Sequence, residues 1–313
     1  MNQFRPGCRG KQATRILHDV LGSFWIRLAA TFALIAVLGS RLDLEKIYHT
    51  IEGFDKSAGL AMFGVNIILI LAFAKRWQVI AASLDFEPPY IQVVRAIWLA
   101  TFLGQFGPTL VIAEATRYRM LKQHATAPQL ILSQVLDRLS GQIVLFILVL
   151  LLFPCYFAQI DASLLKLLEI LFGAMLLLIS ILHFLNRRIR SLPHSDRAIE
   201  LLGRRGLFGH YSLSLIIQLL LVLNFCLAAI GLGVRDQLLP LLVMAPLLFA
   251  AITFLPITLA DWGSRETAAV ILLSPSGLDS ETIVSVSVLY GLFHLLAALP
   301  GGLFLMRNPL RKT

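Results

Sequence analysis

Apolar runs close to the length that crosses a lipid bilayer recur along the whole of this 313-residue chain. A hydrocarbon core about 30 Å thick needs a helix of about 20 apolar residues. Charged residues make up only 14% of the sequence, against roughly 25% in soluble domains, so much of the surface must face something other than water. The runs cover 21–39, 58–74, 91–112, 129–153, 164–185, 211–233, 238–258 and 282–306.

The runs are continuous rather than alternating, which favours helices over strands. Helices also satisfy their own backbone hydrogen bonds, as lipid requires. No stretch is polar enough to form a separate soluble domain. We therefore expect an all-α polytopic membrane protein with a single transmembrane domain at 21–306, a basic cytoplasmic segment at 1–20 and a cytoplasmic tail at 307–313. The first run is full length and follows a long charged region, which predicts a retained helix rather than a cleaved signal peptide.

Basic residues are concentrated beside and between these runs. Of the 27 Lys and Arg residues, 19 lie in the stretches 1–20, 75–95, 113–128, 186–210 and 307–313. Cytoplasmic loops carry an excess of Lys and Arg, so both termini are predicted to lie in the cytoplasm, with the protein in a bacterial-type inner membrane. The basic loops are short and lack interleaved aromatic residues, so nucleic acid is not an expected partner despite the net charge of +9.

Two of the runs conflict with this orientation if each crosses the membrane completely. A full crossing of 91–112 would place the basic stretch 113–128 outside, whereas a helix that turns back at Gly104–Pro108 keeps it inside. The run 238–258 is also broken, near Pro256, and the apolar stretch that follows it is too short to span. We therefore expect about six spanning helices and two re-entrant helical hairpins.

The two broken regions share a sequence pattern. Phe, Pro and Arg occupy offsets 0, 2 and 11, and an acid precedes the Arg by three or four residues. By the charge assignment, one hairpin enters from the cytoplasm and the other from outside. Inverted-topology repeats with broken helices build midplane sites in many transporters, so the pattern predicts a site between the hairpins. The first copy is Phe106, Pro108, Glu114 and Arg117, and the second is Phe254, Pro256, Asp261 and Arg265.

The ionisable residues of this repeat have chemistry suited to a phosphate. Arg binds phosphate through two parallel hydrogen bonds, and Pro stops a helix and frees backbone groups to line a cavity. A carboxylate three or four residues from an Arg on a helix lies on the same face, where it holds the Arg or receives an amine or a proton. An ion pair that only stabilises the hairpin is the alternative. The candidate substrate-binding residues are Glu114, Arg117, Arg138, Asp261, Arg265 and Glu266, with Pro108 and Pro256 as helix breaks.

Other polar residues in the apolar runs are expected to have structural roles. Asp137 and Arg138 are adjacent, so their side chains point apart and they are not expected to pair; Arg138 is predicted to reach Glu114 or an anionic lipid, or to be purely structural. His294 is expected to pack or to bond to the backbone. The Cys and His residues lack metal-site spacing, so no metal or cofactor is expected. Residues expected to bond between helices are Asn66, Gln218 and Asn224.

Taken together, the motifs resemble the transmembrane region of lysylphosphatidylglycerol synthetases and related flippase-like integral membrane proteins. The resemblance covers roughly residues 20–306. Two positions depart from the family pattern: Ile112-Ala113 replaces small Gly residues, and Asp261 stands where Gly is common. The matching positions are Arg76-Trp77, Pro108, Glu114, Arg117, Asp137-Arg138, Pro256-Ile257-Thr258, Trp262-Gly263 and Arg265-Glu266.

This resemblance implies movement of a phospholipid or a polyprenyl-phosphate-linked lipid across the membrane. It does not imply aminoacylation, because nothing in the chain resembles the soluble aminoacyl-transfer domain. No nucleotide-binding loop is present, so an ion or lipid gradient is expected to drive movement. Two alternatives remain open: an intramembrane transferase that acts on a lipid head group with Asp261 and Glu266, and a non-catalytic scaffold. The expected partner is an anionic, aminoacylated or polyprenyl-phosphate-linked lipid, with a second copy of the chain or a lipid-modifying enzyme as further alternatives.

Overall fold

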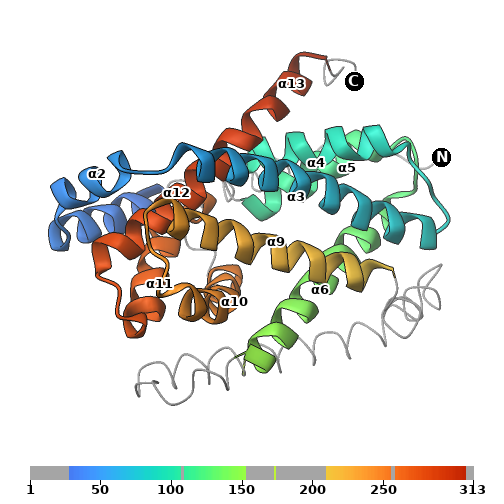
Figure 1. Ribbon diagram of the computed structural model, residues 1–313. Helices are drawn as coiled ribbons and strands as arrows, with labels where there is room; N and C mark the ends of the chain where they lie inside the picture. The colour runs from blue at the N-terminus through green and yellow to red at the C-terminus, as the bar shows by residue number, and fades with distance from the viewer. Residues whose placement is uncertain (1–27, 107–108, 153–172, 174–208, 255–257, 308–313) are drawn as a thin grey trace, which may run out of the picture.

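The computed structural model describes residues 28–106, 109–152, 173, 209–254 and 258–307, and within these ranges every regular element is a helix (Figure 1). This confirms the all-α prediction. The predicted run 164–185, the basic segment 1–20 and the loop 186–210 lie outside the described residues, apart from a few positions. Pro108 and Pro256 also lie outside them.

Among the described residues, four helices are long and apolar enough to cross a membrane. They correspond to the predicted runs 58–74, 129–153, 211–233 and 282–306. The last one continues through a 3-10 turn, η5 (Leu299–Gly302), into α13 (Leu303–Arg307). The four helices are α3 (Lys56–Ser83), α6 (Ala127–Leu152), α9 (His210–Gly231) and α12 (Ser280–Ala298).

Helix α3 extends nine residues beyond the predicted end at residue 74. The basic pair Lys75-Arg76 suggested a cytoplasmic loop, but the helix continues because Arg76 is buried and ion-paired with Asp137 on α6. An acidic residue caps the start of α3, where the carboxylate of Asp55 accepts a hydrogen bond from the backbone N–H of Ser57 at 2.8 Å. The charge at Arg76 therefore belongs to the protein interior rather than to a solvated loop.

The run 91–112 is broken where the sequence predicted. Helix α4 (Tyr90–Gly104) ends at the expected glycine, and four residues separate it from the start of α5 (Thr109–Leu121). The two helices pack against each other, and each is shorter than the roughly 20 residues that span a bilayer (Figure 1). The break is confirmed, while the re-entry of this pair into the membrane stays a prediction.

The second broken run has a similar organisation. Helix α10 (Leu238–Phe254) is followed by the 3-10 turn η3 (Leu259–Asp261) and by the ten-residue helix α11 (Ser264–Leu273), which packs back against α10. Three residues in this connection have positive φ: Ala260, Asp261 and Gly263, at 48°, 62° and 85°. These conformations reverse the chain direction over a few residues, which separates α10 and α11 into two short helices.

The predicted run 21–39 is helical where the structure describes it, and the short helix after it is an element that the sequence did not predict. A 14-residue apolar helix, Leu28–Arg41, is followed by the short amphipathic helix α2 (Leu44–Glu52), which packs on α12. Asp43 caps α2 by accepting hydrogen bonds from two backbone N–H groups. The following turn joins α2 to α3, where the backbone N–H of Asp55 donates to the carbonyl of Gly231 at the end of α9.

Two apolar clusters hold the described helices together. One is formed mainly by α9, α10, α11 and α12, and the other by α3, α4 and α6. Helices α3 and α9 pack along each other and connect the two clusters (Figure 1). The polar side chains described next line a cavity that draws residues from both groups of helices.

Candidate functional site

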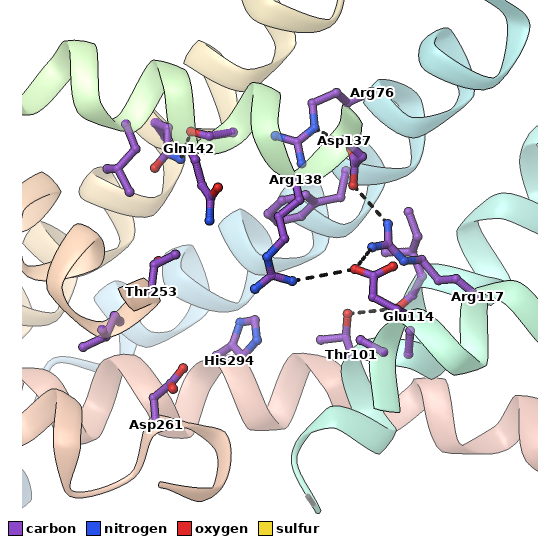
Figure 2. A pocket seen from close by; sticks show the side chains of 18 of the residues that line it. Arg76, Thr101, Glu114, Arg117, Asp137, Arg138, Gln142, Thr253, Asp261 and His294 are labelled. Carbon is purple, nitrogen blue, oxygen red and sulfur yellow. Dashed lines mark hydrogen bonds and ion pairs between the residues drawn. The ribbon is translucent and has the colours of Figure 1, made fainter. Parts of the chain in front are cut away.

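A cavity of about 420 Å³ lies among α3, α4, α5, α6, α9, α10, η3 and α12 (Figure 2). Both halves of the predicted repeat contribute to it, since Glu114 and Arg117 come from α5 and Asp261 comes from η3. Ala113 also lines the cavity, at a position where the resembling family usually has Gly. The charged lining residues are three arginines, Arg76, Arg117 and Arg138, and three acids, Glu114, Asp137 and Asp261.

A continuous chain of ion pairs runs along one wall of this cavity. The carboxylate of Asp137 accepts from Arg76 Nε at 2.7 Å and from Arg117 Nη1 at 3.0 Å. Arg117 also donates from Nη2 to Glu114 Oε1, and Arg138 Nη1 lies 3.8 Å from the same oxygen. The chain ties α3, α5 and α6 together through charged groups (Figure 2).

The five members of this chain differ in how far they are exposed. The side chains of Arg76 and Asp137 are 5% and 6% exposed, and that of Arg117 is 11% exposed. Each is held by short ion pairs. The Arg138 side chain is 42% exposed, and the ion pair that it makes with Glu114 is long, at 3.8 Å. Arg138 is therefore the guanidinium best placed to bind an anion that enters the cavity.

Small residues on two neighbouring helices make room for Arg76. A Cβ atom added at Gly141 of α6 would lie 3.0 Å from Arg76 Nη1. Ser214 of α9 accepts a hydrogen bond from the same nitrogen at 3.1 Å. A larger side chain at either position would displace the guanidinium from Asp137. The interior of this apolar bundle is thus shaped around one buried charge.

Asp261 lies across the cavity from the ion-pair chain, in the part that also contains His294 and the tip of Arg138 (Figure 2). Its φ of 62° belongs to the left-handed region that Gly adopts at least cost, and Asp tolerates it better than most residues. This explains physically how Asp can replace the Gly that is common in the resembling family. The substitution adds a carboxylate to the cavity.

Arg265 and Glu266, by contrast, are not among the residues that line the cavity. Arg265 Nη2 donates to Glu266 Oε1 at 2.8 Å, and Ser287 of α12 donates to the same oxygen at 2.9 Å. The other Glu266 oxygen accepts from the backbone N–H of Gly263 at 2.6 Å. Both side chains are buried, so the structure separates this pair from Arg117 rather than bringing the two predicted arginines together.

The two pairs of adjacent acidic and arginine residues, Asp137-Arg138 on α6 and Arg265-Glu266 on α11, behave differently. Asp137 and Arg138 take different partners, as predicted, and Arg138 reaches Glu114. Arg265 and Glu266 do pair, although neighbours on a helix normally point apart. They lie in the first turn of α11, directly after the positive-φ Gly263, where Glu266 turns back toward the helix start.

Sequence reasoning missed several residues of the cavity. By its charge, Arg76 is typical of a loop residue, and only its match to the resembling family indicates a role in the site. The sequence indicates for Asp137 only that it does not pair with Arg138, whereas the structure shows that it joins two arginines from other helices. His294 Nδ1 lies 3.2 Å from Asn66 Oδ1, a side-chain bond between α12 and α3 that confirms the interhelical role expected for Asn66. Gln142 and Gln218 also line the cavity.

Several apolar helices with membrane-spanning length, enclosing a cavity lined by balanced charges, define a polytopic α-helical membrane protein. The chain belongs to the family described as the lysylphosphatidylglycerol synthase TM region, whose model matches residues 24–302. No curated protein and no solved structure matches the chain. The family membership agrees with the resemblance drawn from the motifs, and it places the protein in a lipid-related membrane class.

Proposed function

We propose that this protein moves a phospholipid or a polyprenyl-phosphate-linked lipid across the cytoplasmic membrane, with both of its termini in the cytoplasm. One observation carries the proposal: the half-exposed Arg138 extends into a cavity to which both broken regions contribute. Ionisable groups within membrane segments are costly and mark substrate pathways. A lipid phosphate is an anion that reaches such a cavity from the bilayer itself.

Arg138 would bind the phosphate by replacing its long contact with Glu114. A guanidinium presents two parallel N–H groups to a phosphate, and such charge-assisted hydrogen bonds are stronger than the 3.8 Å ion pair. Arg117 would remain bound to Asp137 and Glu114, so its role is to hold the wall of the cavity in place. The sequence had named Arg117 and Arg265 as candidate substrate-binding residues alongside Arg138, and the proposal keeps only Arg138 for the phosphate.

In this proposal the two broken regions form the moving part. The α4–α5 pair and the α10–η3–α11 unit each consist of short helices joined at a break, and both contribute to the cavity walls. In transporters with inverted repeats, one repeat rocks against the other around a fixed site. The ion pairs between α5 and α6 would then form or break as the cavity opens to one side.

The transferase alternative needs two acids that act on one substrate. Sequence reasoning named Asp261 and Glu266 for this role. Asp261 lines the cavity, but Glu266 is buried outside it and bonded to Arg265, Ser287 and the backbone of Gly263. The two carboxylates therefore do not converge on a common ligand. Transport needs no such pair.

Purified protein in lipid vesicles tests the proposal. Fluorescent phospholipids are placed in both leaflets, and a membrane-impermeant reductant bleaches those that reach the outer leaflet. The protein is expected to raise the accessible fraction above that of empty vesicles, while mass spectrometry finds the lipid chemically unchanged. A new lipid species would indicate a transferase. A rate equal to that of empty vesicles across anionic, aminoacylated and polyprenyl-phosphate-linked lipids would contradict lipid movement.

A further inference from the structure

Asp261 is the acid of the cavity wall that the backbone holds in an unusual conformation. It has a φ of 62° and follows Ala260, whose φ is 48°, so two successive residues other than glycine adopt left-handed backbone. Such positions persist only where the surrounding structure holds them, and they cluster at functional sites. Asp261 is half-buried and lines the cavity, so its side chain is within reach of a ligand (Figure 2).

The other two acids of the wall are held by arginines. Asp137 accepts hydrogen bonds from two guanidinium groups, and Glu114 accepts from Arg117 and lies 3.8 Å from Arg138. Protonation of either acid would leave a guanidinium poorly compensated in the interior, which is strongly unfavourable. Asp261 lies across the cavity from these ion pairs, so it can take up a proton without breaking them (Figure 2).

The ionised side chains that line the cavity sum to zero charge, since they comprise three arginines and three acids. The lining residues from α4, α9 and α10 are uncharged. Beside the cavity, Arg265 and Glu266 form an ion pair with no net charge, and Tyr290 of α12 packs its ring on the Arg265 guanidinium. Any anion that enters therefore unbalances the site by its own full charge.

A lipid phosphate bound at Arg138 brings such a charge into the cavity. A sphere of the cavity's volume is about 9 Å across, close to the screening length of roughly 8 Å in physiological salt. The phosphate and an ionised Asp261 on the opposite wall therefore repel each other across a medium less polar than water. One proton taken up by Asp261 removes this repulsion and restores the balance of charge.

His294 is the remaining titratable residue of the lining and the rival acceptor for this proton. Its Nδ1 lies 3.2 Å from Oδ1 of Asn66, whose Nδ2 donates to the carbonyl of Met62 at 2.9 Å. A proton on His294 would turn an uncharged imidazole of a spanning helix into a cation, whereas a proton on Asp261 removes a charge from the interior. Creating a buried charge costs free energy, so the comparison favours Asp261.

We propose that Asp261 takes up one proton as a lipid phosphate binds at Arg138, so that lipid and proton cross the membrane together. The inference rests on the proposed function and adds the ion that is coupled to it. The proton comes from water on the side where the lipid enters, binds a carboxylate oxygen of Asp261 and is released when the phosphate leaves. Each ligand favours binding of the other, because such coupling is reciprocal. Gly is common at this position in the family, so the coupling belongs to chains that carry an acid here.

A pH difference across protein-containing vesicles tests the coupling. A trace of fluorescent phosphatidylglycerol starts in both leaflets, potassium and valinomycin hold the membrane potential at zero, and a membrane-impermeant reductant measures the share in the outer leaflet. Movement of one proton with each phosphate is expected to concentrate the lipid on the alkaline side, by up to about tenfold per pH unit. This result does not depend on how the protein is oriented in the vesicles.

The outcomes separate the coupling from the proposed function. A distribution that ignores the pH difference, or that follows a sodium gradient instead, in vesicles where the protein moves the lipid, would overturn the coupling and leave lipid movement standing. If the lipid moves no faster than in empty vesicles, the proposed function fails and the inference falls with it.

Replacement of Asp261 locates the proton site. Asp261→Asn imitates the protonated acid and tolerates left-handed backbone, so it is expected to move lipid without concentrating it on the alkaline side. Asp85→Asn is the matched control, because Asp85 has a φ of 64° but is exposed and outside the cavity lining. It is expected to concentrate lipid as the wild type does. Should Asp261→Asn not purify as a monodisperse protein, Asp261→Gly takes its place, since glycine adopts this backbone at least cost.

Two results with a folded Asp261 variant would overturn the proposal. One is concentration of lipid on the alkaline side to the same extent as in the wild type, which would place the proton elsewhere. The other is a complete loss of lipid movement in Asp261→Asn, because its neutral side chain stands in for the protonated Asp261 that accompanies the phosphate.

Discussion

Asp137 divides its two carboxylate oxygens between arginines from two other helices, Arg76 on α3 and Arg117 on α5. Coulomb attraction inside the bundle offsets the cost of removing three charges from water only while all three partners are present. Glu114 completes the chain by accepting from Arg117 and lying near Arg138. The buried charges therefore fix the positions of three helices. Arg138, at the exposed end of this series of ion pairs, is the member that a ligand in the cavity can reach.

Replacement of Asp137 by Asn is expected to destabilise the protein strongly, because it leaves two guanidinium groups poorly compensated in the interior. The expected loss is about 3–5 kcal/mol of unfolding free energy. Thermal unfolding of the detergent-purified protein measures it. The exposed Asp236 gives a control, since Asp236→Asn is expected to change stability by less than about 0.5 kcal/mol. Similar unfolding temperatures for the two variants would show that the ion pairs contribute little.

The second buried arginine leads to a separate prediction. An added Cβ atom at Gly291 of α12 would clash with the guanidinium of Arg265, which is held by Glu266 and Ser287. Gly291→Ala is therefore expected to cost about 1–3 kcal/mol. At Gly64 of α3 an added Cβ atom meets nothing within 4 Å, so Gly64→Ala is expected to be neutral or slightly stabilising. Thermal unfolding of both variants measures the two changes in stability. A Gly291→Ala protein as stable as the wild type would contradict the claim that Glu266 and Ser287 hold the Arg265 side chain in place.

At the scale of helices, an ion pair between exposed residues connects α2 to the start of α12. Lys46 Nζ lies 3.0 Å from Asp279 Oδ2, and Asp279 also caps α12. Partial burial raises the pKa of Asp279, but hydrogen bonds from Lys46 and Thr282 outweigh it and lower the pKa to about 2. The contribution of this carboxylate to stability is therefore complete above its ordinary pKa of 3.8 and disappears as the pH falls through about 2.

Asp279→Asn removes the charge and keeps a residue that can cap a helix. At pH 7 the variant is expected to be less stable than the wild type, by less than about 1 kcal/mol because both side chains are about half exposed. The difference is expected to shrink as the pH approaches 2. Glu45→Gln, at an exposed position on α2, is the control. Unfolding curves at several pH values measure the effect, and a difference that does not depend on pH would contradict the ion pair.

The sequence predicted the positions of the helix breaks better than the positions of the charges. Gly104 ends α4 as expected, and the chain turns after α10 where Pro256 had indicated a break. Hydropathy alone places Arg76 in a loop, because it cannot show that Asp137 on α6 lies beside Arg76 and pairs with it. Helix α2 was missed for a related reason, since its amphipathic pattern is only nine residues long. Arg265 was placed in the site because its spacing resembled that of Arg117, whereas the positive-φ turn directs it into a closed network.

For the whole molecule, the orientation in the membrane remains to be measured. The positive-inside rule and the two breaks predict that the end of α5 faces the cytoplasm and that the turn after α11 faces outside. With the native cysteines replaced, Lys122→Cys is expected to react with a membrane-impermeant maleimide only from the cytoplasmic side. Ser274→Cys is expected to react only from outside. Both positions are exposed in the structure. Labelling of both from the same side would contradict the inverted repeat.

The central claim is that Arg138 in the shared cavity binds the phosphate of a lipid that the protein moves. The rate of lipid movement in vesicles that contain Arg138→Gln, relative to the wild type, tests it most directly. Loss of a charge-assisted hydrogen bond is expected to lower the rate about 10- to 100-fold. Arg119→Gln, at an exposed position on α5 outside the cavity, is expected to keep the wild-type rate. A folded Arg138→Gln protein that moves lipid as fast as the wild type would contradict the account.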